Sequence, residues 1–123
     1  MRALIVDDSS STRRILGQFM RQMNYEIVEA GNGSEALKRV EEVPDISVAL
    51  VDWNMPVMNG LEFVRELRAR KQHDGVKLMM VTTEHDAEHI EQALLAGANE
   101  FVMKPFTFEV LEEKLAILLN EGC

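Results

Sequence analysis

Short apolar runs alternate five times along the chain with longer segments whose apolar residues recur at helical spacing. A continuous apolar run is typical of a strand that is buried on both faces of a parallel sheet. The pattern therefore predicts a doubly wound α/β fold, with five parallel strands and five helices that cover both faces of the sheet. The predicted strands are Ala3–Val6, Glu26–Glu29, Ser47–Val51, Lys77–Val81 and Glu100–Met103.

Capping signals and helical periodicity locate the five helices. Residues 32–35 resemble an N-cap followed by a capping box, and residues 59–62 repeat that signal. We expect the other helices to begin near the serines at 9–11, near Asp86 and near Thr107, with Gly97 ending the fourth. The side chains expected on the apolar helix faces are Ile15, Phe19, Met20 and Met23, then Ala36, Leu37 and Val40, then Leu61, Val64 and Leu67, then Ile90 and Leu94, and finally Leu111, Leu115 and Leu118.

Chain length, net charge and the lengths of the apolar runs limit the kinds of protein that this chain can be. The 123 residues fit one domain spanning 1–123, and the net charge of −8 disfavours nucleic acid and anionic membranes as direct partners. The longest apolar run, Leu115–Leu119, has five residues and is too short to cross a bilayer. Asp7 and Asp8 interrupt the first apolar run, so no signal peptide is expected, and the only cysteine is Cys123. We therefore expect a cytoplasmic protein without membrane insertion.

Acidic residues stand at the ends of two predicted strands. Asp7 and Asp8 follow the first strand, and Asp52 follows the third. The carboxyl ends of parallel strands lie at one edge of an open α/β sheet, which is where such folds bind ligands. Three carboxylates gathered there repel one another, so the pattern predicts a bound cation. Each acidic cluster taken alone is also compatible with solvated loop aspartates.

Two further strand ends carry complementary polar groups. Thr82 ends the fourth strand with a hydroxyl, and Lys104 follows the fifth with an ammonium group. A single threonine or lysine at such a place needs no functional explanation. Four of five strand ends carrying such groups indicate one functional site at this edge of the sheet.

The residues around these strand ends resemble the receiver domains of two-component signalling, and within that family the single-domain chemotaxis regulators of the CheY type. The resemblance covers essentially the whole chain and implies the strand order of CheY and flavodoxin, 2-1-3-4-5. The matching stretches are Val6-Asp7-Asp8, Ser11-Thr12-Arg13-Arg14-Ile15, Asp52-Trp53-Asn54-Met55-Pro56, Asn59-Gly60-Leu61-Glu62, Met80-Val81-Thr82, Lys104-Pro105-Phe106-Thr107 and Leu111-Glu112-Glu113-Lys114-Leu115.

The resemblance assigns a role to each polar residue. It implies that Asp52 accepts a phosphoryl group from a histidine kinase or a phosphotransfer protein. Lys104 and Thr82 would contact the phosphoryl oxygens. The implied ligands of Mg²⁺ are Asp7, Asp8, Asp52 and the backbone carbonyl of Asn54.

The resemblance also implies that phosphorylation changes the conformation of the chain and thereby its binding to a downstream target protein. Thr82 and Phe101 would be its moving parts, and the fourth helix, fifth strand and fifth helix would form the output face. Regulators of the CheY type have tyrosine where this chain has Phe101. Without the resemblance, Phe101 reads as an ordinary half-buried strand aromatic. Asn54 and Glu84 would border the attacking water and keep the phosphoryl group short-lived, although Glu84 could equally be a solvated cap. The family has a cis peptide bond at the position of Lys104-Pro105.

Three alternatives stay open. A phosphohydrolase of the haloacid dehalogenase type would need a second acid at Asn54, two residues after Asp52. A nucleotide- or flavin-binding domain would need a glycine-rich phosphate loop, which the sequence lacks. A receiver module cut from a longer regulator with a DNA-binding or enzymatic output would look the same as a stand-alone regulator.

We expect a signalling protein that assists its own phosphorylation and dephosphorylation, not an enzyme.

Overall fold

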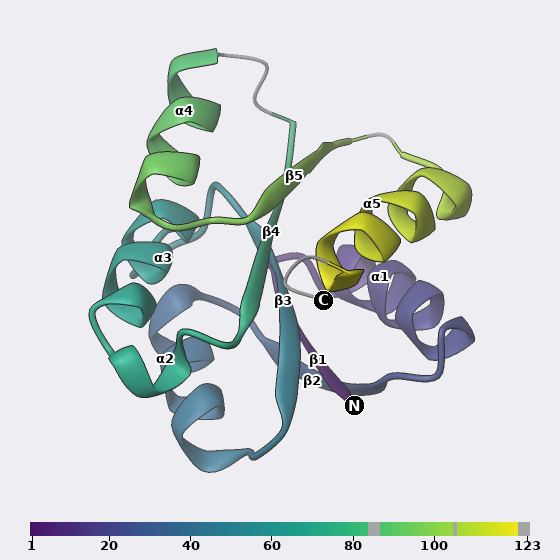
Figure 1. Ribbon diagram of the computed structural model, residues 1–123, viewed down its shortest axis with the longest axis horizontal. Helices are drawn as coiled ribbons and strands as arrows, with labels where there is room; N and C mark the ends of the chain where they lie inside the picture. The colour runs from purple at the N-terminus through teal and green to yellow at the C-terminus, as the bar shows by residue number, and fades with distance from the viewer. Residues whose placement is uncertain (84–86, 105, 121–123) are drawn as a thin grey trace.

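A five-stranded parallel sheet forms the centre of the molecule (Figure 1). The computed structural model describes residues 1–83, 87–104 and 106–120. The strand order is β2-β1-β3-β4-β5, which confirms the predicted α/β fold and its strand order. The strands are β1 (Arg2–Val6), β2 (Glu26–Ala30), β3 (Ile46–Asp52), β4 (Lys77–Thr82) and β5 (Glu100–Met103).

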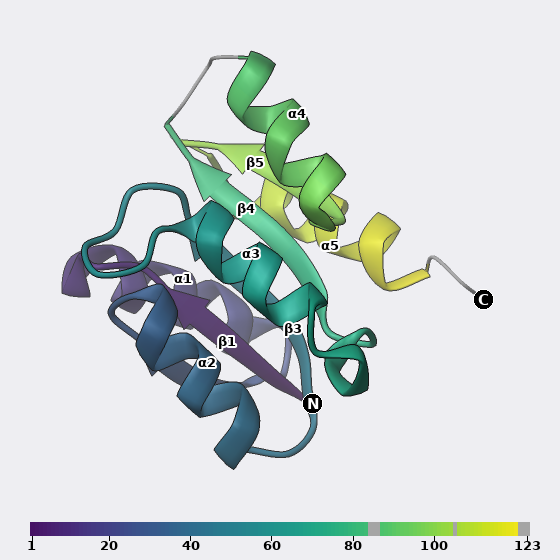
Figure 2. The same ribbon diagram turned by 90° about the vertical axis from the view of Figure 1, so that its left-hand side faces the viewer.

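Helices cover both faces of the sheet. Figure 1 shows α1 and α5 on one face and α2, α3 and α4 on the other, and Figure 2 shows these three side by side. Within the described ranges, no helix combines the length and the apolar character that crossing a bilayer requires. The helices are α1 (Ser10–Gln22), α2 (Gly33–Glu42), α3 (Gly60–Arg68), α4 (Ala87–Ala96) and α5 (Phe108–Asn120), with a short 3₁₀ turn η1 (Lys71–His73) after α3.

Side-chain caps start the first three helices where the sequence predicts them. The side chain of Ser9 accepts from the backbone N–H of Thr12, and that of Asn32 accepts from the helix in the same way. Asn59 and Glu62 form a complete capping box, with bonds of 2.9 Å and 3.0 Å between the side chain of each and the backbone N–H of the other. These caps satisfy backbone donors that the first helical turn leaves without partners.

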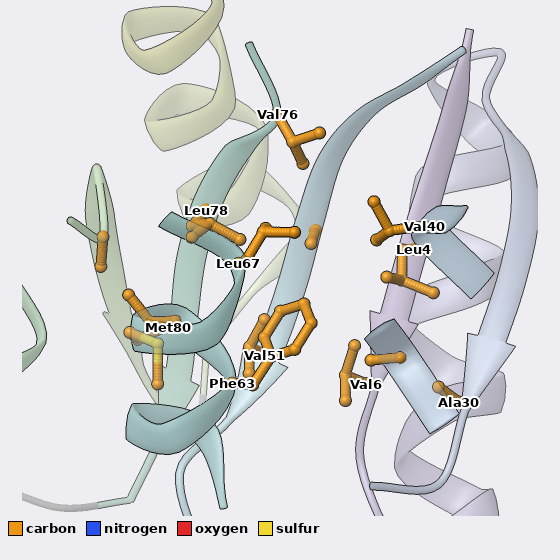
Figure 3. Packing of buried hydrophobic residues seen from close by; sticks show 14 of the residues in the cluster. Leu4, Val6, Ala30, Val40, Val51, Phe63, Leu67, Val76, Leu78 and Met80 are labelled. Carbon is orange, nitrogen blue, oxygen red and sulfur yellow. The ribbon is translucent and has the colours of Figure 1, made fainter. Parts of the chain in front are cut away.

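Each face of the sheet has its own hydrophobic core. Figure 3 shows the core beneath α2 and α3, where the ring of Phe63 is fully buried among side chains of the central strands. The other core lies beneath α1 and α5, and it contains the predicted Leu111, Leu115 and Leu118. Strands β1 and β3 are buried on both faces, which explains their unbroken apolar sequences.

Two expected core residues are in fact exposed. Ile15 is 50% exposed and Leu94 is 42% exposed, so the prediction that they face the sheet is wrong. The neighbouring Leu16 and Ala93 take the inward positions. Consecutive residues on a helix point about 100° apart, so adjacent apolar residues define two overlapping apolar stripes. Only packing against the sheet decides which stripe is buried.

Candidate functional site

The three predicted carboxylates meet at the carboxyl edge of the sheet. Asp7 and Asp8 follow the end of β1, and Asp52 is the last residue of the neighbouring strand β3. Each offers a carboxylate oxygen that lies within 4.8 Å of those of the other two. The side chain of Asp7 is 2% exposed, whereas Asp8 faces solvent. The cluster is therefore buried at Asp7 and open to solvent at Asp8.

Lys104 joins this group from the end of β5. Its Nζ lies 3.2 Å from Oδ2 of Asp7 and 3.4 Å from Oδ1 of Asp52. Its backbone N–H donates to the carbonyl oxygen of Thr82 at 2.9 Å, which ties the end of β5 to the end of β4. One ammonium group cannot balance three carboxylates. The site therefore keeps a negative charge that suits a hard divalent cation with oxygen ligands.

The electrostatics of Asp52 reflect this crowding. Burial raises the pKa of its carboxyl above the ordinary value, and the negative charge of Asp7 raises it further. The charge and hydrogen bond of Lys104 and the backbone N–H of Trp53 act in the opposite direction without cancelling the effect. A cation that binds here would relieve the repulsion that raises this pKa.

The chain turns sharply after Asp52. The N–H of Gly60 donates to the carbonyl of Trp53 at 2.9 Å, and a Cβ atom at Gly60 would collide with the carbonyl oxygen of Asp52. Glycine is therefore required by this close approach. Asn54 is exposed within the turn, two residues after the central carboxylate. The same turn holds Val57 at a φ of 68°, a strained value for a β-branched side chain.

The predicted switch residues line a common cavity. Thr82 is buried at the end of β4 and Phe101 is half-buried on β5, and both border a cavity of ≈ 10 Å³ beneath α4. That volume cannot hold an aromatic ring. Nζ of Lys114 lies 4.8 Å from the centre of the Phe101 ring. Inward rotation of Phe101 would require Thr82 or α4 to move and would break this cation–π contact.

Sequence reasoning missed two contacts of the site. The ring of His89 on α4 packs against Trp53, with 5.0 Å between the ring centres. The side chain of Arg13 on α1 donates to the backbone carbonyl of Asp7. No local sequence pattern indicates either contact, because the two residues of each contact lie on different elements. The predicted lifetime residue Glu84 and the Lys104-Pro105 peptide bond fall outside the described residues.

Relatives of this chain carry chemotaxis names. Residues 3–116 match the family model of the response regulator receiver domain. A protein named "Chemotaxis protein CheY homolog" from Campylobacter jejuni is 42% identical over 123 residues, which cover 99% of this chain and 95% of the relative. "Chemotaxis protein CheY1" from Helicobacter pylori is 42% identical over 121 residues, covering 98% of each chain.

Solved structures show the same architecture. The chemotaxis protein CheY4 of Vibrio cholerae superposes with a TM-score of 0.88 at 34% identity, covering 95% of this chain and 97% of that one. A two-component system response regulator/GGDEF domain protein superposes with a TM-score of 0.90 at 30% identity, but the match covers 49% of that longer chain. The acidic edge, the strand order and these similarities agree, and the chain belongs to the response regulator receiver domain family, with CheY-like proteins among its relatives.

Proposed function

We propose that this chain is a phosphorylation-controlled switch in which Asp52 accepts a phosphoryl group in the presence of Mg²⁺. The observation that carries the proposal is the joint position of three carboxylates and the Lys104 ammonium at one edge of the sheet. Receiver domains act as signalling proteins and not as enzymes in the usual sense. Here the chain itself would assist the attachment and the hydrolysis of its phosphoryl group.

The donor set fits Mg²⁺. Asp8 and Asp52 would bind the ion directly, Asp7 largely through water, and the backbone carbonyl of Asn54 would complete the protein ligands. Mg²⁺ prefers oxygen ligands and keeps several of its waters, which suits a carboxylate cluster that is exposed at Asp8. When bound, the ion supplies positive charge that offsets the charge of the phosphoryl oxygens.

Asp52 would act as a carboxylate nucleophile. One of its oxygens forms a bond to phosphorus while the bond from phosphorus to the imidazole nitrogen of a phosphohistidine breaks, and the imidazole takes a proton from solvent. Lys104 stands within 3.4 Å of Asp52, so its ammonium is available to a phosphoryl oxygen. Thr82 would donate its hydroxyl proton to another of these oxygens. Thr82 is the last residue of the buried strand β4, and Lys104 is held by its ion pairs with Asp7 and Asp52.

The partners would be a histidine kinase or phosphotransfer protein and a downstream target. The names of the Campylobacter jejuni and Helicobacter pylori relatives, of whose length the chain covers 95–98%, support a chemotaxis-type regulator, which would act in the cytoplasm. A phosphotransfer profile against the purified histidine kinases of the host would identify the donor. By the family resemblance, Asn54 and Glu84 would set a short phosphoryl lifetime.

The switch would run from Thr82 to the output face formed by α4, β5 and α5. A hydroxyl drawn toward the phosphoryl group vacates space beside the cavity that Thr82 and Phe101 share. The ring of Phe101 can then turn inward, away from Lys114. A ligand shifts the equilibrium between two conformations only if it binds one of them more tightly. The Thr82 hydrogen bond supplies that difference in binding. A charge-assisted bond of roughly 1.5–3 kcal/mol changes the population ratio by about ten- to a hundredfold.

Thr82→Ala should uncouple modification from the structural response. The variant keeps Asp52, Lys104 and the metal ligands, so beryllofluoride should still bind. Amide chemical shifts recorded with and without beryllofluoride should change strongly around Phe101 and α4 in wild type and only weakly in the variant. Thr83→Ala, at the exposed neighbouring threonine, is the matched control and should respond like wild type. Equal shift changes in Thr82→Ala and wild type would refute the coupling.

A further inference from the structure

We propose that Arg13 is a positioning residue of the cation site, and this inference rests on the proposed function. Arg13 lies near the start of α1, and its side chain is 21% exposed. One Nη atom donates to the carbonyl oxygen of Asp7 at 2.5 Å, while Nε donates to the carboxylate of Glu29 on β2 at 3.0 Å. The guanidinium therefore links α1, β2 and the loop that carries two of the three acids.

Arg13 completes the fixation of Asp7. The N–H of Asp7 donates to the carbonyl of Ala30 at 3.1 Å. Its Oδ1 accepts from the N–H of Ser9 at 2.9 Å, and its Oδ2 accepts from Lys104 at 3.2 Å. The carbonyl oxygen is the remaining polar group of this residue, and Arg13 binds it. Every polar group of a nearly fully buried aspartate is thus held by a neighbour on another segment or in the adjoining loop.

The bond to the Asp7 carbonyl also places Asp8. The carbonyl of Asp7 and the N–H of Asp8 belong to one planar peptide unit, so fixing one orients the other. Asp8 is exposed, and within the described part of the chain no hydrogen bond or ion pair of its carboxylate is present. Its position in the site therefore depends on its backbone. Groups that orient metal ligands in this way commonly change metal affinity by 10- to 100-fold when they are removed.

If Arg13 positions the site, its removal should weaken Mg²⁺ binding; if only its charge matters, its removal should strengthen Mg²⁺ binding. Arg13 is positive, so its removal would strengthen the binding of a cation if only its charge mattered. Removal would also leave the negative charge of the Glu29 carboxylate without its partner in the ion pair. A positioning residue has the reverse effect, because Asp7 and Asp8 lose their fixed geometry. The direction of the change in Mg²⁺ affinity therefore separates the two explanations.

The test is a Mg²⁺ titration of the full chain, followed by the fluorescence of Trp53, the only tryptophan. Arg13→Met removes the donors and the charge but keeps an apolar stem, and we expect the Kd for Mg²⁺ to rise about tenfold. Arg14→Met is the matched control, with the same charge change at an exposed neighbour, and should leave the Kd within about twofold of wild type. Urea unfolding of each variant shows that binding is measured on folded protein.

Arg13→Lys provides a second test that does not depend on Arg13→Met being folded. Its charge is unchanged, but one ammonium cannot reproduce the planar fork that reaches both Asp7 and Glu29. We expect a Kd at least threefold above that of wild type. A Kd for either Arg13 variant equal to or below the wild-type value would overturn the positioning role. A wild-type protein that gives neither a fluorescence change nor heat with Mg²⁺ would overturn the proposed metal site itself.

Discussion

Asp52→Asn should stabilise the metal-free protein and remove most of its response to Mg²⁺. The pKa of Asp52 is raised above 3.8 by burial and by Asp7, so the ionised side chain costs free energy in the fold. The amide has no charge and removes this cost, so the free energy of unfolding should rise. The gain should be complete at neutral pH, shrink as the pH falls through the folded-state pKa of Asp52, and vanish below its ordinary value of 3.8.

Thermal unfolding with and without Mg²⁺ measures both effects. At about ten times its Kd, the ion should add roughly 1.4 kcal/mol to the stability of wild type and little to that of Asp52→Asn. Glu66→Gln changes the net charge equally at an exposed position on α3 and should behave as wild type. An Asp52→Asn variant that is less stable than wild type without metal, or that gains equally from Mg²⁺, would show that the three carboxylates do not form a strained cation site.

Arg68→Met is expected to destabilise the fold by about 2–4 kcal/mol without altering the carboxylate site. The guanidinium of Arg68, at the end of α3, donates to the carbonyl of Gly97 at 3.0 Å, to that of Val76 at 2.8 Å and to the side chain of Asn99 at 2.9 Å. It also reaches the carbonyl of His73 at 3.3 Å. Methionine would leave the carbonyls of Gly97 and Val76 without this donor. The side chain of Asn99 would keep the N–H of Leu78, and the carbonyl of His73 would keep the N–H of Val76.

Urea unfolding with a matched variant tests this role. Arg65→Met removes a positive charge from an exposed position on the same helix, and its unfolding midpoint should stay close to that of wild type. Arg68→Lys should recover only part of the loss, because an ammonium cannot reach acceptors on several segments at once. The acids lie at the opposite end of the strands, so Mg²⁺ affinity should be unchanged at low temperature. A midpoint for Arg68→Met equal to that of Arg65→Met would contradict this account.

The sequence predicts the sheet and its polar edge well because both follow from local rules. The apolar runs of β1 and β3 are unbroken since both strands are covered on both faces. Each run ends in acids, and parallel strands place such ends together, so the cluster of Asp7, Asp8 and Asp52 could be predicted. The strand order follows only from the family resemblance, because no local pattern encodes which strands are neighbours.

The features that the sequence does not reveal are contacts between distant segments. Arg68 and Arg13 are charged residues on amphipathic helices, and nothing near them in the chain indicates that they bind backbone carbonyls elsewhere. The choice between Ile15 and Leu16 as the buried residue likewise depends on how α1 rests on the sheet. Such contacts exist only once the tertiary structure is formed.

The most direct test of the central claim is the intact mass of the protein after incubation with acetyl phosphate. In the presence of Mg²⁺, wild type should gain the mass of one phosphoryl group, and EDTA should prevent the gain. Asp52→Asn should gain nothing, since an amide is not a nucleophile of this kind. Glu66→Gln should be modified as wild type is. Full incorporation into Asp52→Asn, or incorporation into wild type that is indifferent to EDTA, would contradict the assignment of Asp52 as the Mg²⁺-dependent phosphoacceptor.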